Sequence, residues 1–342
     1  MPGPKGTRGP NRNGRGRQTV ARELDDQLTK YLTDAHSIEV QALAQLRSAP
    51  DIAGTPELAQ AFRTHLDETE GHERTTRELL EARDAKPSKV KDTVMGIGGK
   101  GFLLFAKLQP DTPGKLLAHA LSYEGLEVAS YELLMRVAER AGDERVSAAA
   151  TRIRDEERTM MQRLEANVDQ AVEASLREHP RDDVETLLRK YLSDAHAIEE
   201  QAIALLERAP KLVEDPQLES IFSDHLAETR DHAELIQERL NALGDDPSSL
   251  KDAAMRLGAL NWGAFFQGHP DTPGKLTAFA YAFEYLEIGG YEQLKRVAGR
   301  ADDPQTVRLV EHILEQERAA ATKLAGAFNV AALVSLREVG VN

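Results

Sequence analysis

The chain has 342 residues, no cysteine, 10 histidines and a formal net charge of −14. The lack of cysteine excludes disulfides, zinc–thiolate sites and thiol catalysis, and aromatic residues make up only 5% of the chain, so its cores should consist mainly of Ala, Leu, Val and Ile. No apolar run approaches the roughly 20 residues that span a bilayer and no stretch resembles a signal peptide, so we expect a cytoplasmic protein with no membrane contact.

The first 22 residues differ in composition from the rest. They hold six Lys and Arg and no acidic residue, are rich in Gly and Pro, and lack hydrophobic periodicity. This composition predicts a disordered basic tail over 1–22. The remaining chain has a net charge of −20, since the whole chain is −14 and the tail is +6. The tail could contact nucleic acid weakly or act as a solubilising extension, whereas the acidic remainder would repel DNA.

The rest of the chain is a tandem duplication. Residues 31–50 read YLTDAHSIEVQALAQLRSAP, residues 191–210 read YLSDAHAIEEQAIALLERAP, and thirteen of these twenty positions are identical. The same offset relates the two copies of DTPGK, at 111–115 and 271–275. The period is far longer than a solenoid unit, so each copy should be a domain. We expect domains at 23–176 and 183–338, which form a pseudo-dimer within the chain that could self-associate further.

Four long segments in each copy have helical periodicity, and none has the alternation of a strand. In the first copy these segments are 22–48, 56–84, 113–141 and 143–174. The first and last connections are short, which predicts antiparallel neighbours, whereas the long stretch 85–112 joins the second helix to the third. A four-helix bundle with such a crossover has the ferritin-like topology. The predicted fold class is therefore all-α, with two tandem ferritin-like four-helix bundles.

Each predicted helix has polar residues where its apolar stripe should continue. Burying several carboxylates without compensation is unfavourable by several kcal/mol per ion, and no Lys or Arg interrupts the stripes at the same level. A pair of metal ions is the simplest compensation, and oxygen-rich ligation with one or two imidazoles suits iron or manganese better than structural zinc. The candidate ligands in the first copy are Glu39, His65, Glu68, His72, Glu124, Glu127 and Glu157.

The same candidates recur in the second copy. Glu156 and His119, by contrast, are replaced by Gln316 and Phe279, which argues against them as ligands. Tyr131 recurs as Tyr291, and both are candidate electron donors or radical relays beside the metals. The matching ligand candidates are Glu199, His225, Glu228, His232, Glu284, Glu287 and Glu317.

Several motifs resemble the YciE/YciF-type ferritin-like family of bacterial stress proteins. They are LTDAHSIEVQ around Glu39, AFRTHLDETEGHE around Glu68, YEGLEVASYELL around Glu124 and Glu127, and DEER around Glu157. The resemblance covers essentially all of each copy. It implies a ferritin-like bundle, a dinuclear non-haem site, and a role in oxidative or general stress.

The histidines depart from the best-known diiron bundles, which carry a Glu-x-x-His motif on each of two helices. Here the second helix has His65-x-x-Glu68-x-x-x-His72, and no His lies near Glu157. The sequence therefore predicts a carboxylate-rich site and leaves open which of His65 and His72 coordinates, and likewise which of His225 and His232.

The leading functional hypothesis is a di-metal protein with two iron ions per bundle, or manganese, that reacts with O2 or peroxide. In this hypothesis Glu68 or Glu127 bridges the metals, and the other carboxylates supply the remaining oxygen ligands. One alternative is a non-catalytic metal-binding stress or scaffold protein. Another is DNA protection of the mini-ferritin kind through the basic tail.

Overall fold

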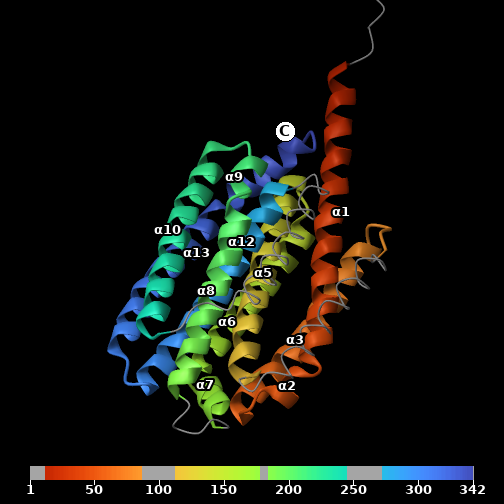
Figure 1. The fold of residues 1–342 in the computed structure, drawn as a ribbon. Coiled ribbons are helices and arrows are strands. Elements are labelled where there is room, and N and C mark those ends of the chain that lie inside the picture. Colours follow the sequence, from red (N-terminus) through yellow and green to blue (C-terminus); the bar gives the residue numbers. More distant parts are fainter. Residues whose placement is uncertain (1–11, 87–111, 178–183, 245–271, 342) are drawn as a thin grey trace, which may run out of the picture.

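The computed structural model describes residues 12–86, 112–177, 184–244 and 272–341. Within these ranges all regular structure is helical, and no strand occurs, which confirms the predicted all-α class. The helices form two bundles that lie side by side (Figure 1).

The first bundle contains four long helices. Helix α1 packs against α3 and α5, and α6 also packs against α3 and α5, so the four surround one core. Thr55 begins α3 by accepting a hydrogen bond from the backbone N–H of Leu58, and Asp143 does the same for α6. The helices are α1 (Arg12–Leu46), α2 (Ala49–Ile52), α3 (Pro56–Glu81), α5 (Thr112–Ala141), α6 (Glu144–Ala166) and α7 (Val168–Leu176).

The second bundle repeats this arrangement. Its helices are α8 (Val184–Leu206), α9 (Ala209–Leu212), α10 (Pro216–Ala242), α12 (Thr272–Arg300) and α13 (Pro304–Glu338). The unbroken α13 corresponds to α6 and α7 together. In the first bundle Asn167 interrupts the helix, with φ −102° and its side-chain amide donating to the backbone oxygen of Arg163, whereas the second bundle has Ala327 at this position.

Residues 12–22, predicted to be disordered, form the first turns of α1. No proline follows Pro10 in this region, and extending an existing helix is far easier than nucleating one. Residues 1–11 lie outside the described residues, as does most of the long connection at 85–112.

The two bundles pack through α5 and α12. The helices approach closely where glycines face the partner helix: a Cβ on Gly289 would lie 2.9 Å from Cα of Ala118. Two ion pairs related by the duplication flank this contact, Lys115 with Asp194 at 3.6 Å and Lys275 with Asp34 at 3.1 Å. The two copies thus pack as a covalently fused pair.

One helix among the described residues, α13, is long and apolar enough by composition to cross a membrane, although no such span was expected. The apolar window of α13 is 56% buried inside the protein. The core packing of α13 accounts for this apolar composition.

Candidate metal centre

Six acidic and imidazole side chains from four helices meet in the core of the first bundle, and all are buried. They form two groups, in each of which one ligand atom per residue lies within 4.8 Å of the others. Glu157 belongs to both groups. The first group, called site A1, is His65, Glu124, Glu127 and Glu157, and the second, called site A2, is Glu39, His72 and Glu157.

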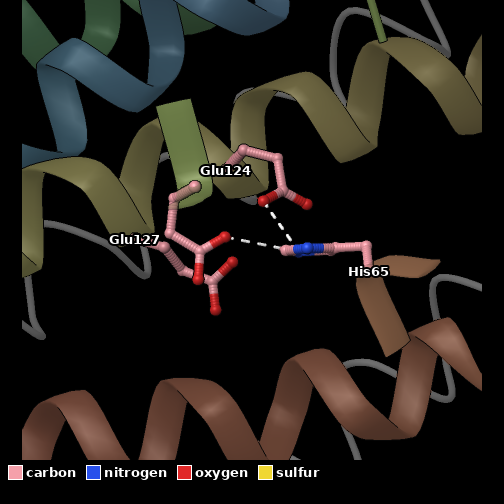
Figure 2. A group of neighbouring side chains, drawn as sticks. His65, Glu124 and Glu127 are labelled. Atoms are coloured by element: carbon pink, nitrogen blue, oxygen red, sulfur yellow. Dashed lines mark ion pairs between the residues drawn. The ribbon is translucent and has the colours of Figure 1, made fainter. Parts of the chain in front are cut away.

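Helix periodicity explains how these side chains converge. His65 and His72 are seven residues apart on α3, which is two turns, so both project from one face. Glu124 and Glu127 are about one turn apart on α5. Figure 2 shows His65 from α3 pointing at the carboxylates of α5. The structure therefore brings both histidines to the centre, one in each group.

Glu157 lies between the two histidines. Its Oε2 is 3.3 Å from Nε2 of His65, and its Oε1 is 2.8 Å from Nδ1 of His72. Nε2 of His65 is also 3.0 Å from Oε2 of Glu124. One oxygen of Glu157 thus faces each group, so Glu157 is the carboxylate that the two groups share, whereas the sequence had suggested Glu68 or Glu127 for the shared position.

Many polar atoms of the centre have no hydrogen-bond partner among the described residues. They include both carboxylate oxygens of Glu127 and Glu157, Nε2 of His65 and Nδ1 of His72. An unsatisfied buried polar group is costly, and a buried ion more so. Oxygen and imidazole donors that converge on one point and lack other partners fit divalent metal ions.

Burial and mutual repulsion favour the protonated forms of three carboxyl groups, those of Glu39, Glu127 and Glu157. Burial is the main reason why the pKa of Glu39 rises to about 8, and it also raises the pKa values of Glu127 and Glu157. Burial lowers the pKa of His72, but its carboxylate neighbours outweigh this and raise it to about 9. Bound metal ions would displace these protons, because ligands must be deprotonated to coordinate.

Glu68, a predicted ligand, has contacts of a different kind from those of the six clustered residues. It lies outside both groups and accepts hydrogen bonds from Arg163, at 2.7 Å to Nη1 and 3.0 Å to Nη2. Burial raises its pKa, but hydrogen bonds from His65 and Arg163 outweigh this and lower it to about 2. Its Oε2 is 3.2 Å from Nδ1 of His65, so Glu68 orients that ring and leaves Nε2 to face the centre.

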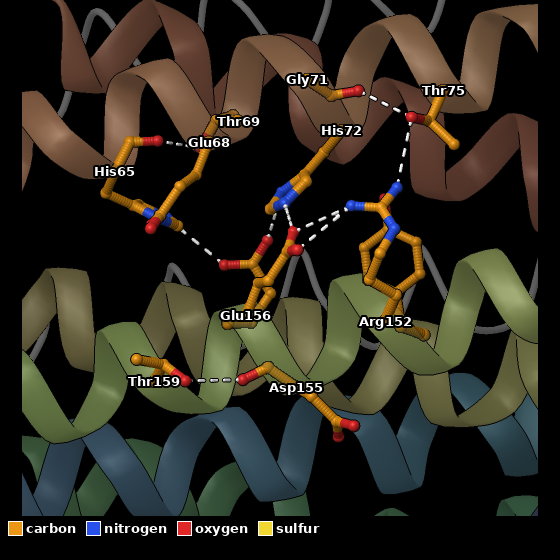
Figure 3. A network of polar contacts seen from close by, with 12 residues as sticks. His65, Glu68, Thr69, Gly71, His72, Thr75, Arg152, Asp155, Glu156 and Thr159 are labelled. Carbon is orange, nitrogen blue, oxygen red and sulfur yellow. Dashed lines mark hydrogen bonds and ion pairs between the residues drawn. The ribbon is translucent and has the colours of Figure 1, made fainter.

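Glu156 orients the ring of His72 as Glu68 orients that of His65, and Figure 3 shows this contact. Its Oε2 lies 2.6 Å from Nε2 of His72, so that nitrogen carries the proton and Nδ1 faces the centre. Comparing the two copies of the sequence argued against a role for Glu156, because the second copy has Gln316 at this position. A Gln side chain can accept the same hydrogen bond through its amide oxygen, so the Glu-to-Gln exchange was compatible with a shared contact.

Tyr131 contacts the centre through Glu39. Its buried phenol donates to Oε1 of Glu39 at 2.5 Å, and Tyr291 makes the same contact with Glu199. Both tyrosines therefore lie next to a candidate ligand, and their part as electron donors stays a prediction.

The second bundle contains an equivalent centre. Nε2 of His225 lies 2.7 Å from Oε1 of Glu284, and Nδ1 of His232 lies 2.8 Å from Oε1 of Glu317. Glu228 again lies outside the groups, where it pairs with Lys323 at 3.1 Å. Site B1 is His225, Glu284, Glu287 and Glu317, and site B2 is Glu199, His232 and Glu317.

Each centre thus has four carboxylates and two imidazoles. This is the donor set of the best-known diiron bundles, in which two helices each supply a Glu and the other two each supply a Glu-x-x-His pair. Here both imidazoles come from one helix, α3 or α10, and the paired carboxylates come from α5 or α12.

Comparison with known families agrees with this division of the chain. The sequence profile described as domain of unknown function DUF892 matches residues 23–177 and again residues 183–333. The chain belongs to the DUF892 family. This family is ferritin-like in fold. Each DUF892 match spans one bundle, and each of the two bundles has its own pair of candidate metal sites.

Proposed function

We propose that each DUF892 bundle binds two iron ions and that the protein oxidises Fe(II), with hydrogen peroxide or O2 as the oxidant. The observation that carries this proposal is the position of Glu157, which belongs to both groups of ligand atoms and directs one oxygen toward the histidine of each. Manganese has similar ligand preferences and is the alternative metal.

The residues of the chain have distinct parts in this scheme. Site A1 would hold one ion, site A2 the other, and Glu157 would contact both. Such a metal pair supplies electrons to a small oxidant. With peroxide the reaction balances when two Fe(II) each lose one electron and one H2O2 takes up two electrons and two protons to give two waters. Tyr131 holds Oε1 of Glu39 and leaves Oε2 for the ion.

The donor set favours this function over a purely structural one. Structural zinc sites are closed, tetrahedral and usually rich in cysteine, whereas this chain has no cysteine and each centre has four carboxylates. Elemental analysis of protein from cells supplied with iron, manganese and zinc tests the point. Zinc as the bound metal would favour the non-catalytic alternative.

The decisive experiment compares the oxidation of Fe(II) by two proteins. Protein loaded with Fe(II) without oxygen and mixed with peroxide should form Fe(III) faster than free Fe(II) does. The E157Q/E317Q double variant should lose this acceleration, since each substitution removes a carboxylate shared by two sites. The matched control is E144Q, which neutralises an exposed carboxylate far along the same helix. Equal rates for wild type and the double variant would refute the proposal.

The stress role implied by the YciE/YciF resemblance is part of this proposal. A protein that consumes Fe(II) together with peroxide removes both reagents that produce hydroxyl radicals. Cells that lack the protein should therefore be more sensitive to peroxide in iron-rich medium, and the E157Q/E317Q variant should not restore resistance. Full rescue by that variant would separate the stress role from the metal centres.

A further inference from the structure

The two centres of the chain differ in the residue that is hydrogen-bonded to the ring of one candidate histidine ligand. All six members of the first centre have an identical residue in the second. Nε2 of His72, however, is hydrogen-bonded to the carboxylate of Glu156 at 2.6 Å, whereas Nε2 of His232 is hydrogen-bonded to the amide oxygen of Gln316 at 2.9 Å.

This difference changes charge but not geometry. Carboxylate and amide oxygens both accept the Nε2 proton, so in both bundles Nδ1 faces the centre. A carboxylate carries a negative charge and makes a stronger hydrogen bond with the ring than an amide does. A carboxylate partner also raises the basicity of a metal-bound imidazole and attracts a cation through its own charge.

We propose that site A2 binds a divalent metal ion more tightly than site B2 does, and that Glu156 is the positioning residue responsible. The two halves of the chain are then inequivalent: as metal becomes available, site A2 fills before site B2. This inference rests on the metal binding of the proposed function, but it does not depend on the reaction.

Neighbouring charges do not cancel the difference. Arg152 donates to both oxygens of Glu156, at 3.2 Å and 3.1 Å, as Figure 3 shows. Its side chain is 51% exposed, so solvent screens its charge, and the shorter contact of Glu156 is with His72. The residue equivalent to Arg152 in the second bundle is His312, which is exposed.

Two other differences near the centres leave the charge beside His72 and His232 unchanged. Arg163 and Lys323 are both cations and pair with the carboxylates that orient the histidines of sites A1 and B1. Tyr123 is replaced by Phe283, but the phenol of Tyr123 is neutral and donates to the backbone oxygen of Ile38.

Glu73, which is replaced by Ala233, is a further difference in charge, but its carboxylate pairs with Arg77 at 3.1 Å and lies 4.0 Å from Nδ1 of His36. Glu156 is the charged group that is hydrogen-bonded to the ring of a site A2 ligand.

The test is a titration of the metal-free full chain with Mn²⁺, in which free Mn²⁺ is measured by its paramagnetic resonance signal. In the wild type, sites A2 and B2 should differ in affinity. E156Q should lower the affinity for one of the bound Mn²⁺ ions on the order of 10- to 100-fold, which is the usual effect of removing such a hydrogen-bond partner. Q316E should raise the affinity for one of the bound Mn²⁺ ions, a gain that a merely structural role for Glu156 would not produce. E144Q, the matched charge control, should leave the titration unchanged.

The outcomes separate this inference from the proposed function. If Mn²⁺ does not bind at all, the metal centres themselves are refuted. If Mn²⁺ binds but E156Q and Q316E both leave every affinity unchanged, the metal centres stand and the inequivalence is refuted. Circular dichroism of both variants should match the wild type, since Gln and Glu can exchange at these partly exposed positions without loss of the hydrogen bond.

Discussion

Oε1 of Glu157 lies 2.8 Å from Nδ1 of His72 in the buried core of the first bundle. The two residues come from α6 and α3, and the carboxylate atom has no hydrogen-bond partner outside the centre among the described residues. A short contact between two potential ligands that lack other partners is what a shared cation would stabilise.

Replacing the shared carboxylates should have opposite effects with and without metal. Without metal, E157Q/E317Q removes a carboxylate from each crowded cluster, so the midpoint of thermal unfolding should rise or stay level. With metal in 100-fold excess over its dissociation constant, each bound ion stabilises the wild type by about 2.7 kcal/mol, and the variant should lose this gain. Thermal unfolding in EDTA and in Mn²⁺ measures both effects. A variant that Mn²⁺ stabilises as much as the wild type would contradict the prediction.

The metal-free protein should lose stability as pH rises from about 5 to 9. The pKa of Glu39 is raised from 4.5 to about 8 in the folded state, and that of His72 from 6.5 to about 9. In both cases the folded protein binds more protons than the unfolded chain between the two values, so the stabilisation is lost as pH rises through them. Glu68, with a lowered pKa of about 2, loses its contribution only as the pH falls below about 4.5.

Thermal unfolding in EDTA across this pH range provides the measurement. The E39Q/E199Q variant lacks one such carboxyl group per bundle and should show a shallower decline. Saturating metal should flatten the decline further, because bound ions keep the ligands deprotonated at every pH in the window. A metal-free midpoint that rises between pH 5 and 9 would contradict the direction of both pKa shifts.

The hydrogen bond from Tyr131 should matter more to metal binding than that from Tyr123. Y131F leaves Oε1 of Glu39 without its donor, and an unsatisfied buried group costs about 1–3 kcal/mol, so affinity at site A2 should fall. Tyr123 bonds only the backbone oxygen of Ile38, and the second bundle already has Phe283 at this position. Y123F should therefore bind Mn²⁺ as the wild type does. Equal affinities for the two variants would show that the phenol of Tyr131 does not position Glu39.

The contact between the bundles should be sensitive to one added methyl group. G289A would place a Cβ 2.9 Å from Cα of Ala118 and force α5 and α12 apart, which should destabilise the protein by about 1–3 kcal/mol. Gly299, on the same helix, has no neighbour within 4 Å of such a Cβ, so G299A should stabilise by up to about 1 kcal/mol through helix propensity. Urea unfolding of both variants tests the contrast. A G289A protein as stable as G299A would show that the helices can separate freely.

The sequence alone was sufficient for the fold and for the position of the centres. Its 160-residue offset and its helical stripes predicted two all-α bundles, because periodic burial of apolar residues largely determines a helix-bundle fold. Interruptions of those stripes by Glu and His located the polar centre at the middle of each bundle. The seven-residue spacing of His65 and His72, two helical turns, also places both rings on one face of the helix.

Only the tertiary structure decided the part of each polar residue. Glu68 and Glu157 look alike in the sequence, yet Arg163, 95 residues away, holds Glu68 outside the groups, while Glu157 points between two histidines of another helix. Glu156, adjacent to Glu157, faces the opposite ring nitrogen of His72. Periodicity gives the side of a helix on which a residue lies. Which atom it meets depends on how that helix is rotated and displaced against its neighbours, which only the packed structure specifies.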